Sequence, residues 1–215
     1  PNTGQTSCID ASVGYYVPST AATSQLACSA STYQPNTGQI SCLDADAGYY
    51  VPSWGGASQT ACSPGTYQPN SGQMSCAYAN AGYYVPSWGG TSQTACFVGA
   101  YQPNTGQISC LEADAGYYVA STESASQTAC VAGTYQAAPG QTSCTEADPG
   151  HYVDSEASAT QTPAPVDYYA EGFASTSPEP CPENFMTLAS ANWSPEGCHL
   201  DSDGDRSPDY DDDDD

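Results

Sequence analysis

Nine cysteines recur at two strictly alternating intervals, and this spacing limits what the chain can fold into. A long interval, as from Cys8 to Cys28, alternates with a short one, as from Cys28 to Cys42, which gives a 34-residue repeat. The string PNTGQTSC at residue 1 returns as PNTGQISC at 35 and 103 and as PNSGQMSC at 69. Such a repeat predicts small units that stabilise their neighbours, and we expect the chain, which begins inside a unit, to be cut from a longer array. The cysteines are Cys8, Cys28, Cys42, Cys62, Cys76, Cys96, Cys110, Cys130 and Cys144.

The repeat does not have the pattern of a helix. A 34-residue period also occurs in helical tetratricopeptide arrays. Here each unit contains several glycines and a proline, and no apolar residues recur at helical spacing. We therefore expect strands and turns.

The composition by itself favours disorder, and the cysteines oppose it. Leu, Ile, Val and Phe make up roughly a tenth of the residues, and the formal net charge is -23. Such a chain cannot bury enough apolar surface to fold on that basis alone. A disulfide that closes a loop of about 15 residues contributes ~3 kcal/mol, and the chain has 11 cysteines. Regular cysteines without metal-type spacing predict a secreted or cell-surface protein of an oxidising, extracellular compartment.

The charge also excludes two classes of partner. The chain has no lysine, and Arg206 is its one arginine. Nucleic acids and anionic membranes are bound through clusters of basic residues, and no apolar run approaches the ~20 residues of a membrane span. We expect no nucleic-acid partner and no direct membrane insertion of this segment.

Each unit consists of two related halves, of which the short half contains a clear turn. The short half is CSPGTYQPNSGQMSC (62–76), and the long half is AGYYVPSWGGASQTAC (47–62). Both follow the scheme Gly-x-Tyr, a turn, then Gln-x-x-Cys. In the short half, 66–68 and 73–75 flank the turn-forming residues Pro-Asn-Ser-Gly at 69–72. This predicts a short hairpin that needs a disulfide at its base.

Two disulfide patterns fit the spacing, and the last unit favours one of them. Its sequence has Ala164 where a cysteine is expected. Long-half pairing would leave Cys144 without a partner, whereas short-half pairing leaves only Cys8, whose partner would lie one short interval upstream of Cys8. The short-half pairs are Cys28–Cys42, Cys62–Cys76, Cys96–Cys110 and Cys130–Cys144. The long-half pairs are Cys8–Cys28, Cys42–Cys62, Cys76–Cys96 and Cys110–Cys130.

The short half, C-x-x-G-T-Y-x-x-x-x-G-Q-x-S-C, resembles the cysteine-rich repeats of ephrin-receptor-like and tumour-necrosis-factor-receptor-like ectodomains. The likeness covers residues 1–163 and is carried by Cys62, Gly65, Tyr67, Gly72 and Cys76. The long half departs from it, because alanine replaces the second cysteine of C-x-x-C-x-x-G. We therefore expect the long halves to be looser than in the relatives. These alanines are Ala11, Ala45, Ala79, Ala113 and Ala147.

The resemblance implies the fold class. It is a small disulfide-rich repeat protein, an elongated tandem array of short β-hairpins with little helix and no large core. Such modules serve as spacers as often as binding sites, so the fold implies no particular function.

Aromatic residues recur with the repeat and have two interpretations. Double tyrosines at 49–50, 83–84 and 117–118 precede valines, and Trp54 and Trp88 stand in matching PSWGG turns. They form either a ladder of carbohydrate-stacking platforms or the apolar mass that packs one unit on the next. Recurrence in every unit favours packing for the tyrosines. Packing is favoured less strongly for the tryptophans, because turns flanked by glycine are often exposed.

Beyond the repeats, residues 164–180 are rich in Pro, Ser, Ala and acids, which predicts a linker. Residues 181–200 are expected to form a small loop closed by Cys181–Cys198. This loop contains Asn192-Trp193-Ser194, a possible N-glycosylation site.

The segment 201–215 has the alternating acids of a calcium loop. It resembles the calcium-binding repeats of thrombospondin type 3, D-x-D-G-D-x-x-x-D. Arg206 stands where an EF-hand would have glycine, and no helix pattern flanks the loop. The other interpretation is a solvated acidic tail. The expected Ca²⁺ ligands are Asp201, Asp203, Asp205, Ser207 through its carbonyl, Asp209 and Asp212.

Nothing in the sequence indicates catalysis. The histidines are His151 and His199, and no nucleophile, phosphate-loop or zinc motif accompanies them. We expect the protein not to be an enzyme.

These observations predict an extracellular structural protein: a rod, stalk or fibre subunit stapled by disulfides and stiffened by calcium, with possible homotypic assembly into fibres. The alternative is an adhesin or receptor ectodomain that binds glycan or protein through Trp54, Trp88 and the tyrosines. Near-identical units at 35–68 and 69–102 favour the structural role.

Overall fold

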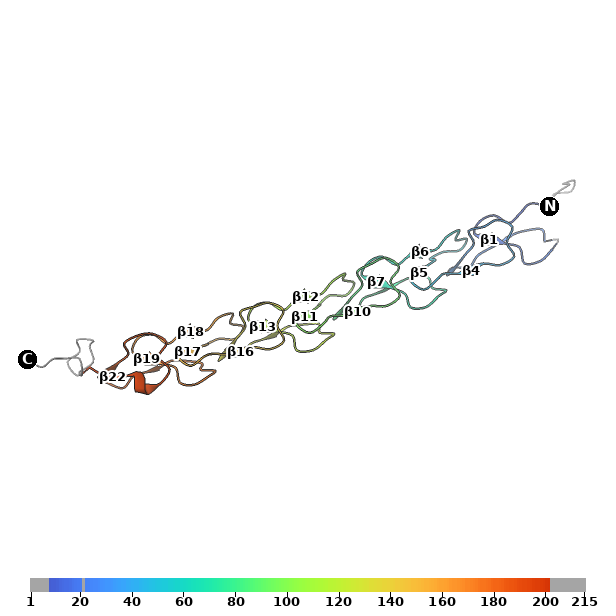
Figure 1. The fold of residues 1–215 in the computed structure, drawn as a ribbon. Coiled ribbons are helices and arrows are strands. Elements are labelled where there is room, and N and C mark those ends of the chain that lie inside the picture. Colours follow the sequence, from blue (N-terminus) through green and yellow to red (C-terminus); the bar gives the residue numbers. More distant parts are fainter. Residues whose placement is uncertain (1–7, 21, 202–215) are drawn as a thin grey trace, which may run out of the picture. The chain divides into compact units, whose positions relative to one another are not determined.

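The computed structural model describes residues 8–20 and 22–201. The chain divides into two compact units. The first consists of Pro1–Cys96 and Gln102–Cys110, and the second of Phe97–Tyr101 and Leu111–Asp215. In each unit, two-stranded antiparallel hairpins follow one another in chain order (Figure 1).

The described residues form eleven hairpins, each with two residues per strand. Those of the first unit are β1 (Tyr15–Tyr16) with β2 (Leu26–Ala27), β3 (Thr32–Tyr33) with β4 (Leu43–Asp44), β5 (Tyr49–Tyr50) with β6 (Thr60–Ala61), β7 (Thr66–Tyr67) with β8 (Ala77–Tyr78), and β9 (Tyr83–Tyr84) with β10 (Thr94–Ala95).

Those of the second unit are β11 (Ala100–Tyr101) with β12 (Leu111–Glu112), β13 (Tyr117–Tyr118) with β14 (Thr128–Ala129), β15 (Thr134–Tyr135) with β16 (Thr145–Glu146), β17 (His151–Tyr152) with β18 (Thr162–Pro163), β19 (Tyr168–Tyr169) with β20 (Glu179–Pro180), and β21 (Phe185–Met186) with β22 (His199–Leu200). A short 3₁₀ helix, η1 (Pro195–Gly197), lies in the loop of the last hairpin.

The structural repeat is half the interval expected from the cysteines. Tyr15, Thr32 and Tyr49 open successive hairpins, and the same 17-residue interval continues to Phe185. The two halves of the 34-residue repeat are therefore equal in length and in fold. They differ in how they are joined to their neighbours, because cysteine pairs occur at alternate joints between hairpins.

The expected second strand of the short half, 73–75, is wrong. Thr66–Tyr67 pairs with Ala77–Tyr78 instead. The carbonyl of Gln73 accepts a hydrogen bond from the amide of Val51 at 3.0 Å, so this stretch is used by the preceding hairpin. The side chain of Gln68 donates to the carbonyl of Ser75 at 2.8 Å and closes the longer loop.

Neighbouring hairpins are joined mainly through their backbones. In the first unit, Gly48 N donates to Gln68 O at 2.8 Å, Val51 N to Gln73 O at 3.0 Å, and Gly72 N to Ala45 O at 2.7 Å. In the second unit, the equivalent three bonds join Gly116 to Gln136, Val119 to Gln141 and Gly140 to Ala113. Because main-chain groups need partners when buried, this docking does not require large apolar side chains.

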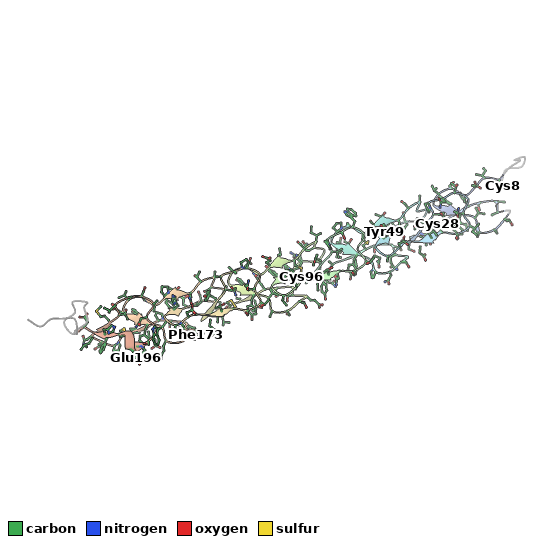
Figure 2. All side chains as sticks on the ribbon, in the orientation of Figure 1. Cys8, Cys28, Tyr49, Cys96, Phe173 and Glu196 are labelled. Atoms are coloured by element: carbon green, nitrogen blue, oxygen red, sulfur yellow. A yellow bond between two sulfur atoms is a disulfide. The ribbon has the colours of Figure 1, made fainter. Side chains whose placement is uncertain are left out.

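The core is built mainly from two series of side chains, most of them small. One residue, alanine or cysteine, lies four positions before each hairpin and is almost fully buried in most of them. This Ala/Cys series includes Ala11, Cys28, Ala45, Cys62, Ala79, Cys96, Ala113, Cys130, Ala147 and Ala164. Cys28 and Cys96 are labelled in Figure 2. The second series follows each first strand and includes Gln34, Val51, Val85, Gln102, Val119 and Val153. The prediction of a hairpin repeat without a large core is confirmed.

The segment 164–180, whose composition favours a linker, contains the hairpin β19–β20. Ala164 N donates to Gly150 O at 2.8 Å, and Ala174 N donates to Ala147 O at 3.0 Å. These two bonds are equivalent to backbone bonds of the earlier hairpins, for example Cys62 N to Gly48 O and Gly72 N to Ala45 O. Neither of them requires a cysteine. No helix in the described part of the chain is long and apolar enough to cross a membrane.

Candidate functional site

The disulfides follow the short-half pattern, and the long-half alternative is wrong. The Cα atoms of each pair lie 5.7 or 5.8 Å apart, within the range that a disulfide bridges. Cys8 is a free, exposed thiol. The five pairs are Cys28–Cys42, Cys62–Cys76, Cys96–Cys110, Cys130–Cys144 and Cys181–Cys198.

Each repeat disulfide ties together two consecutive hairpins. Cys62 directly follows β6, and Cys76 directly precedes β8, so this bond links the second strands of neighbouring hairpins. Cys62 is fully buried, whereas Cys76 is half-buried. The staple therefore reinforces the same joint that the backbone hydrogen bonds make.

Most joints without a disulfide carry a glutamine in its place, which the sequence patterns did not reveal; at the joint of Ala164 the equivalent residue is Pro178. Gln59 occupies the position of Cys76 in its own hairpin, opposite Ala45, which occupies the position of Cys62. Its Oε1 accepts from the Asp46 amide at 2.7 Å, and its Nε2 donates to Asp46 Oδ2 at 2.6 Å. We call this bond from glutamine Oε1 to the backbone a glutamine clip. The others join Gln25 to Ser12, Gln93 to Asn80, Gln127 to Asp114 and Gln161 to Asp148, each at 2.7 Å.

A signal for the clips exists in the sequence, namely the glutamine three residues before each of the nine repeat cysteines. Matching the halves by Gln-x-x-Cys places Gln59 against Gln73. The hairpins themselves place Gln59 against Cys76, three residues later. Only the strand register reveals this correspondence.

The tyrosines and the tryptophans differ in burial. Tyr49 and Tyr50 are half-buried in their strand, like the tyrosines of most other hairpins. Trp54 is 72% exposed and Trp88 is 68% exposed. The packing interpretation is therefore wrong for the tryptophans, because most of each side chain is open to solvent.

Trp88 borders a groove of about 500 Å³ in the first unit. We call it the aromatic groove and define it by Tyr50, Thr60, Thr66, Ser75, Tyr78 and Trp88. Tyr78 is 70% exposed, and no charged residue lines the groove. A larger hollow of about 880 Å³ lies at the first hairpin, but no aromatic ring lines it.

The predicted calcium ligands mostly lie outside the described residues. This holds for Asp203, Asp205, Ser207, Asp209 and Asp212. Asp201 is half-buried, and its amide donates to Asn184 O at 2.8 Å. Within residues 8–20 and 22–201, no group of three or more His, Cys, Asp or Glu side chains is arranged to hold a metal.

The glycosylation motif lies in the loop closed by Cys181–Cys198. The Asn192 side-chain amide donates to the Ser194 carbonyl at 2.9 Å, and Ser194 is buried. A sugar on this nitrogen would have to coexist with or replace that bond. Asn192 is therefore held within the loop in the unmodified chain.

One ionisable group in the second unit is clearly perturbed. The Tyr169 hydroxyl donates to Glu179 Oε2 at 2.9 Å across β19 and β20. This hydrogen bond, followed by desolvation and the negative charges of Glu179 and Glu171, raises the pKa of Tyr169 above its ordinary value of 10.0.

No protein-family model matches the chain, and a comparison with curated proteins finds no similar sequence. The resemblance to receptor modules therefore rests on its short motif.

Proposed function

We propose that this chain is a non-enzymatic structural repeat of the extracellular space, a spacer or stalk whose length is set by its number of hairpins. The observation that carries the proposal is the uniform joint. Consecutive hairpins repeat a common set of backbone bonds, and alternate joints add a disulfide. A joint made mainly by backbone bonds does not depend on particular side chains, so the array can be extended by further hairpins that dock in the same way.

The extracellular assignment is part of the proposal. Five disulfides form between cysteines close in sequence, and such bonds persist in oxidising compartments. The net charge of -23 supports a highly solvated surface that resists nonspecific collapse. The resemblance to ectodomain repeats agrees with this setting.

Electron microscopy of the natively purified protein tests the structural role. We expect uniform rods or fibres, which keep their length in physiological salt. Compact particles of variable shape would contradict the proposal. Limited proteolysis with and without a reductant provides the control, since reduction should expose the loops between Cys62 and Cys76 and their equivalents.

The proposed stiffening by calcium belongs to the segment 201–215. Alternating carboxylates are suitable oxygen ligands for Ca²⁺. We expect Asp203 and Asp205 to be two of the ligands in the middle of this set. Isothermal titration calorimetry with CaCl₂ should give saturable heat for the full chain. The double variant Asp203→Asn/Asp205→Asn should lose that heat, whereas Asp154→Asn should retain it. Equal heats for both variants would indicate a diffuse acidic tail.

A further inference from the structure

We propose that the aromatic groove is a binding site for a neutral saccharide. This goes beyond the structural role and does not rest on it. The groove has three aromatic residues, Tyr50, Tyr78 and Trp88, together with hydroxyl-bearing residues on the strands between them. Sugar sites in proteins combine these two elements, rings for the C–H faces and polar groups for the hydroxyls.

The side chains of Tyr78 and Trp88 are both mostly exposed. Tyr78 ends β8, and its ring lies over Gly106, where an added Cβ would be 3.0 Å from the ring carbon Cδ1. The ring therefore lies close to the backbone of Gly106. One side of the ring lies against this backbone, and most of its remaining surface is open to a ligand.

The hydroxyl groups of the groove retain hydrogen-bonding capacity. The Thr66 hydroxyl donates to the Ser63 carbonyl at 2.7 Å and lies 3.4 Å from the Ser63 hydroxyl, which leaves one lone pair of its oxygen able to accept from a ligand. Thr60 and Ser75 are exposed in the same groove. With the phenol groups of Tyr50 and Tyr78, these residues match the donors and acceptors of a sugar ring.

The neighbouring repeats do not carry the same set of residues. In the register of their hairpins, Asp44 and Glu112 occupy the position of Tyr78. Trp54 corresponds to Trp88, so the preceding repeat has the tryptophan with Asp44 and Leu26 in place of Tyr78 and Thr60. The complete set of Tyr78, Thr60 and Trp88 is therefore present at this groove and not at the equivalent place in the preceding repeat.

Charge decides the class of saccharide. The chain carries a net charge of -23 without any lysine, and the groove itself is lined by uncharged residues. An acidic or sulfated sugar would meet repulsion without a basic partner. A cation would be attracted, but rings this exposed do not enclose and desolvate it, as strong cation–π binding requires. A neutral, uncharged sugar face fits best.

Affinity electrophoresis of the full chain tests this proposal, with soluble neutral glucan, mannan and galactan embedded in separate gels. We expect at least one of them to retard the wild type. Trp88→Ala should weaken that retardation at least tenfold, and so should Tyr78→Asp, which installs the residue of the preceding repeat. Trp54→Ala is the matched control, and its mobility should equal that of the wild type.

Four results would overturn the proposal. These are no retardation by any of the three neutral polysaccharides, an equal loss with Trp54→Ala, equal retardation by a sulfated polysaccharide, or release of the protein by millimolar tetramethylammonium. Because Trp88 and Tyr78 are exposed, their variants should keep the wild-type number of free thiols, which verifies folding independently.

Discussion

At the residue scale, two positions recur with a left-handed backbone in the 17-residue units of the described chain. One lies just before the first strand and the other in the loop after it, as at Gly48 (φ 82°) and Gly55 (φ 75°). Later in the chain the loop position is taken by residues other than glycine, including Ala157 and Ala174, each with φ 57°. Such residues lie in this region at a cost of roughly 1–2 kcal/mol.

We expect Gly48→Ala to destabilise its hairpin by at least about 2 kcal/mol. The added methyl group would require a strained φ and would collide with the carbonyl oxygen of Gly89, two hairpins further on. Faster hydrogen exchange at the Cys62 amide, which donates to Gly48 O, should report the loss. Unchanged exchange at Cys62 would contradict this account of the glycine.

The converse substitution, Ala157→Gly, should stabilise its hairpin by about 0.5–1 kcal/mol. Relief of the left-handed strain exceeds the added entropy of glycine in the unfolded chain. Slower exchange at the Ala157 amide position, which donates to Cys130 O, is the expected measurement. Ala164→Gly is a suitable control, because Ala164 is buried and does not have a positive φ, and it should destabilise.

The pKa of Tyr169 gives a prediction with a definite sign. Because the folded state raises this pKa, it holds the proton more tightly than the unfolded state. The stabilisation that comes from protonated Tyr169 is fully present below pH 10, and it is lost as pH rises through the raised pKa of the folded state. In a nuclear magnetic resonance titration of tyrosine ring carbons, Glu179→Gln should lower the Tyr169 pKa. An identical titration in both proteins would show that Glu179 is not the cause.

At the element scale, the disulfide and the glutamine clip are two ways of closing the same joint. Gln59 and Ala45 stand where Cys76 and Cys62 stand one hairpin later. The clip bonds through a neutral amide, and a typical hydrogen bond of this kind contributes about 1 kcal/mol. A disulfide closing a loop of this length contributes about 3 kcal/mol.

The equivalence predicts that Ala45→Cys/Gln59→Cys will form an additional disulfide. The register places these residues as it places the natural pairs, whose Cα atoms are 5.7–5.8 Å apart. We expect a stability gain of about 2 kcal/mol, the disulfide contribution less that of the lost clip. Mass spectrometry should find no new free thiol in the double variant and one new free thiol in Gln59→Cys. A persistent pair of free thiols would refute the equivalence.

At the scale of the whole molecule, hairpins recur every 17 residues, whereas the disulfides of the repeat recur every 34 residues. Deleting residues 49–82 removes two hairpins with both Cys62 and Cys76. Deleting residues 49–65 removes one hairpin and Cys62 alone, which leaves Ala45 opposite Cys76. Both deletions preserve the 17-residue spacing of the remaining strands.

We expect the longer deletion to be tolerated better than the shorter one. It should retain a single free thiol, Cys8, and native hydrogen-exchange protection in the remaining hairpins. The shorter deletion should show two free thiols and reduced protection around the new joint. Equal thiol counts in the two proteins would mean that the cysteines had paired differently.

The amino-acid sequence by itself determined the repeat, the absence of long helices and the preferred disulfide pairing. The paired cysteines are close in sequence and close short loops, and Ala164 at the end of the series favoured one pattern. These features are local, so residue spacing is sufficient to derive them.

The tertiary structure decided what depends on hydrogen bonds between separate hairpins. The pairing of β7 with β8, the glutamine clips and the hairpin in 164–180 all follow from main-chain bonds whose partners are not marked by residue type. The same holds for the aromatic groove, since Tyr50 and Trp88 come together only after three hairpins have docked. Backbone groups are alike in every residue, and only their positions in the fold determine which of them meet.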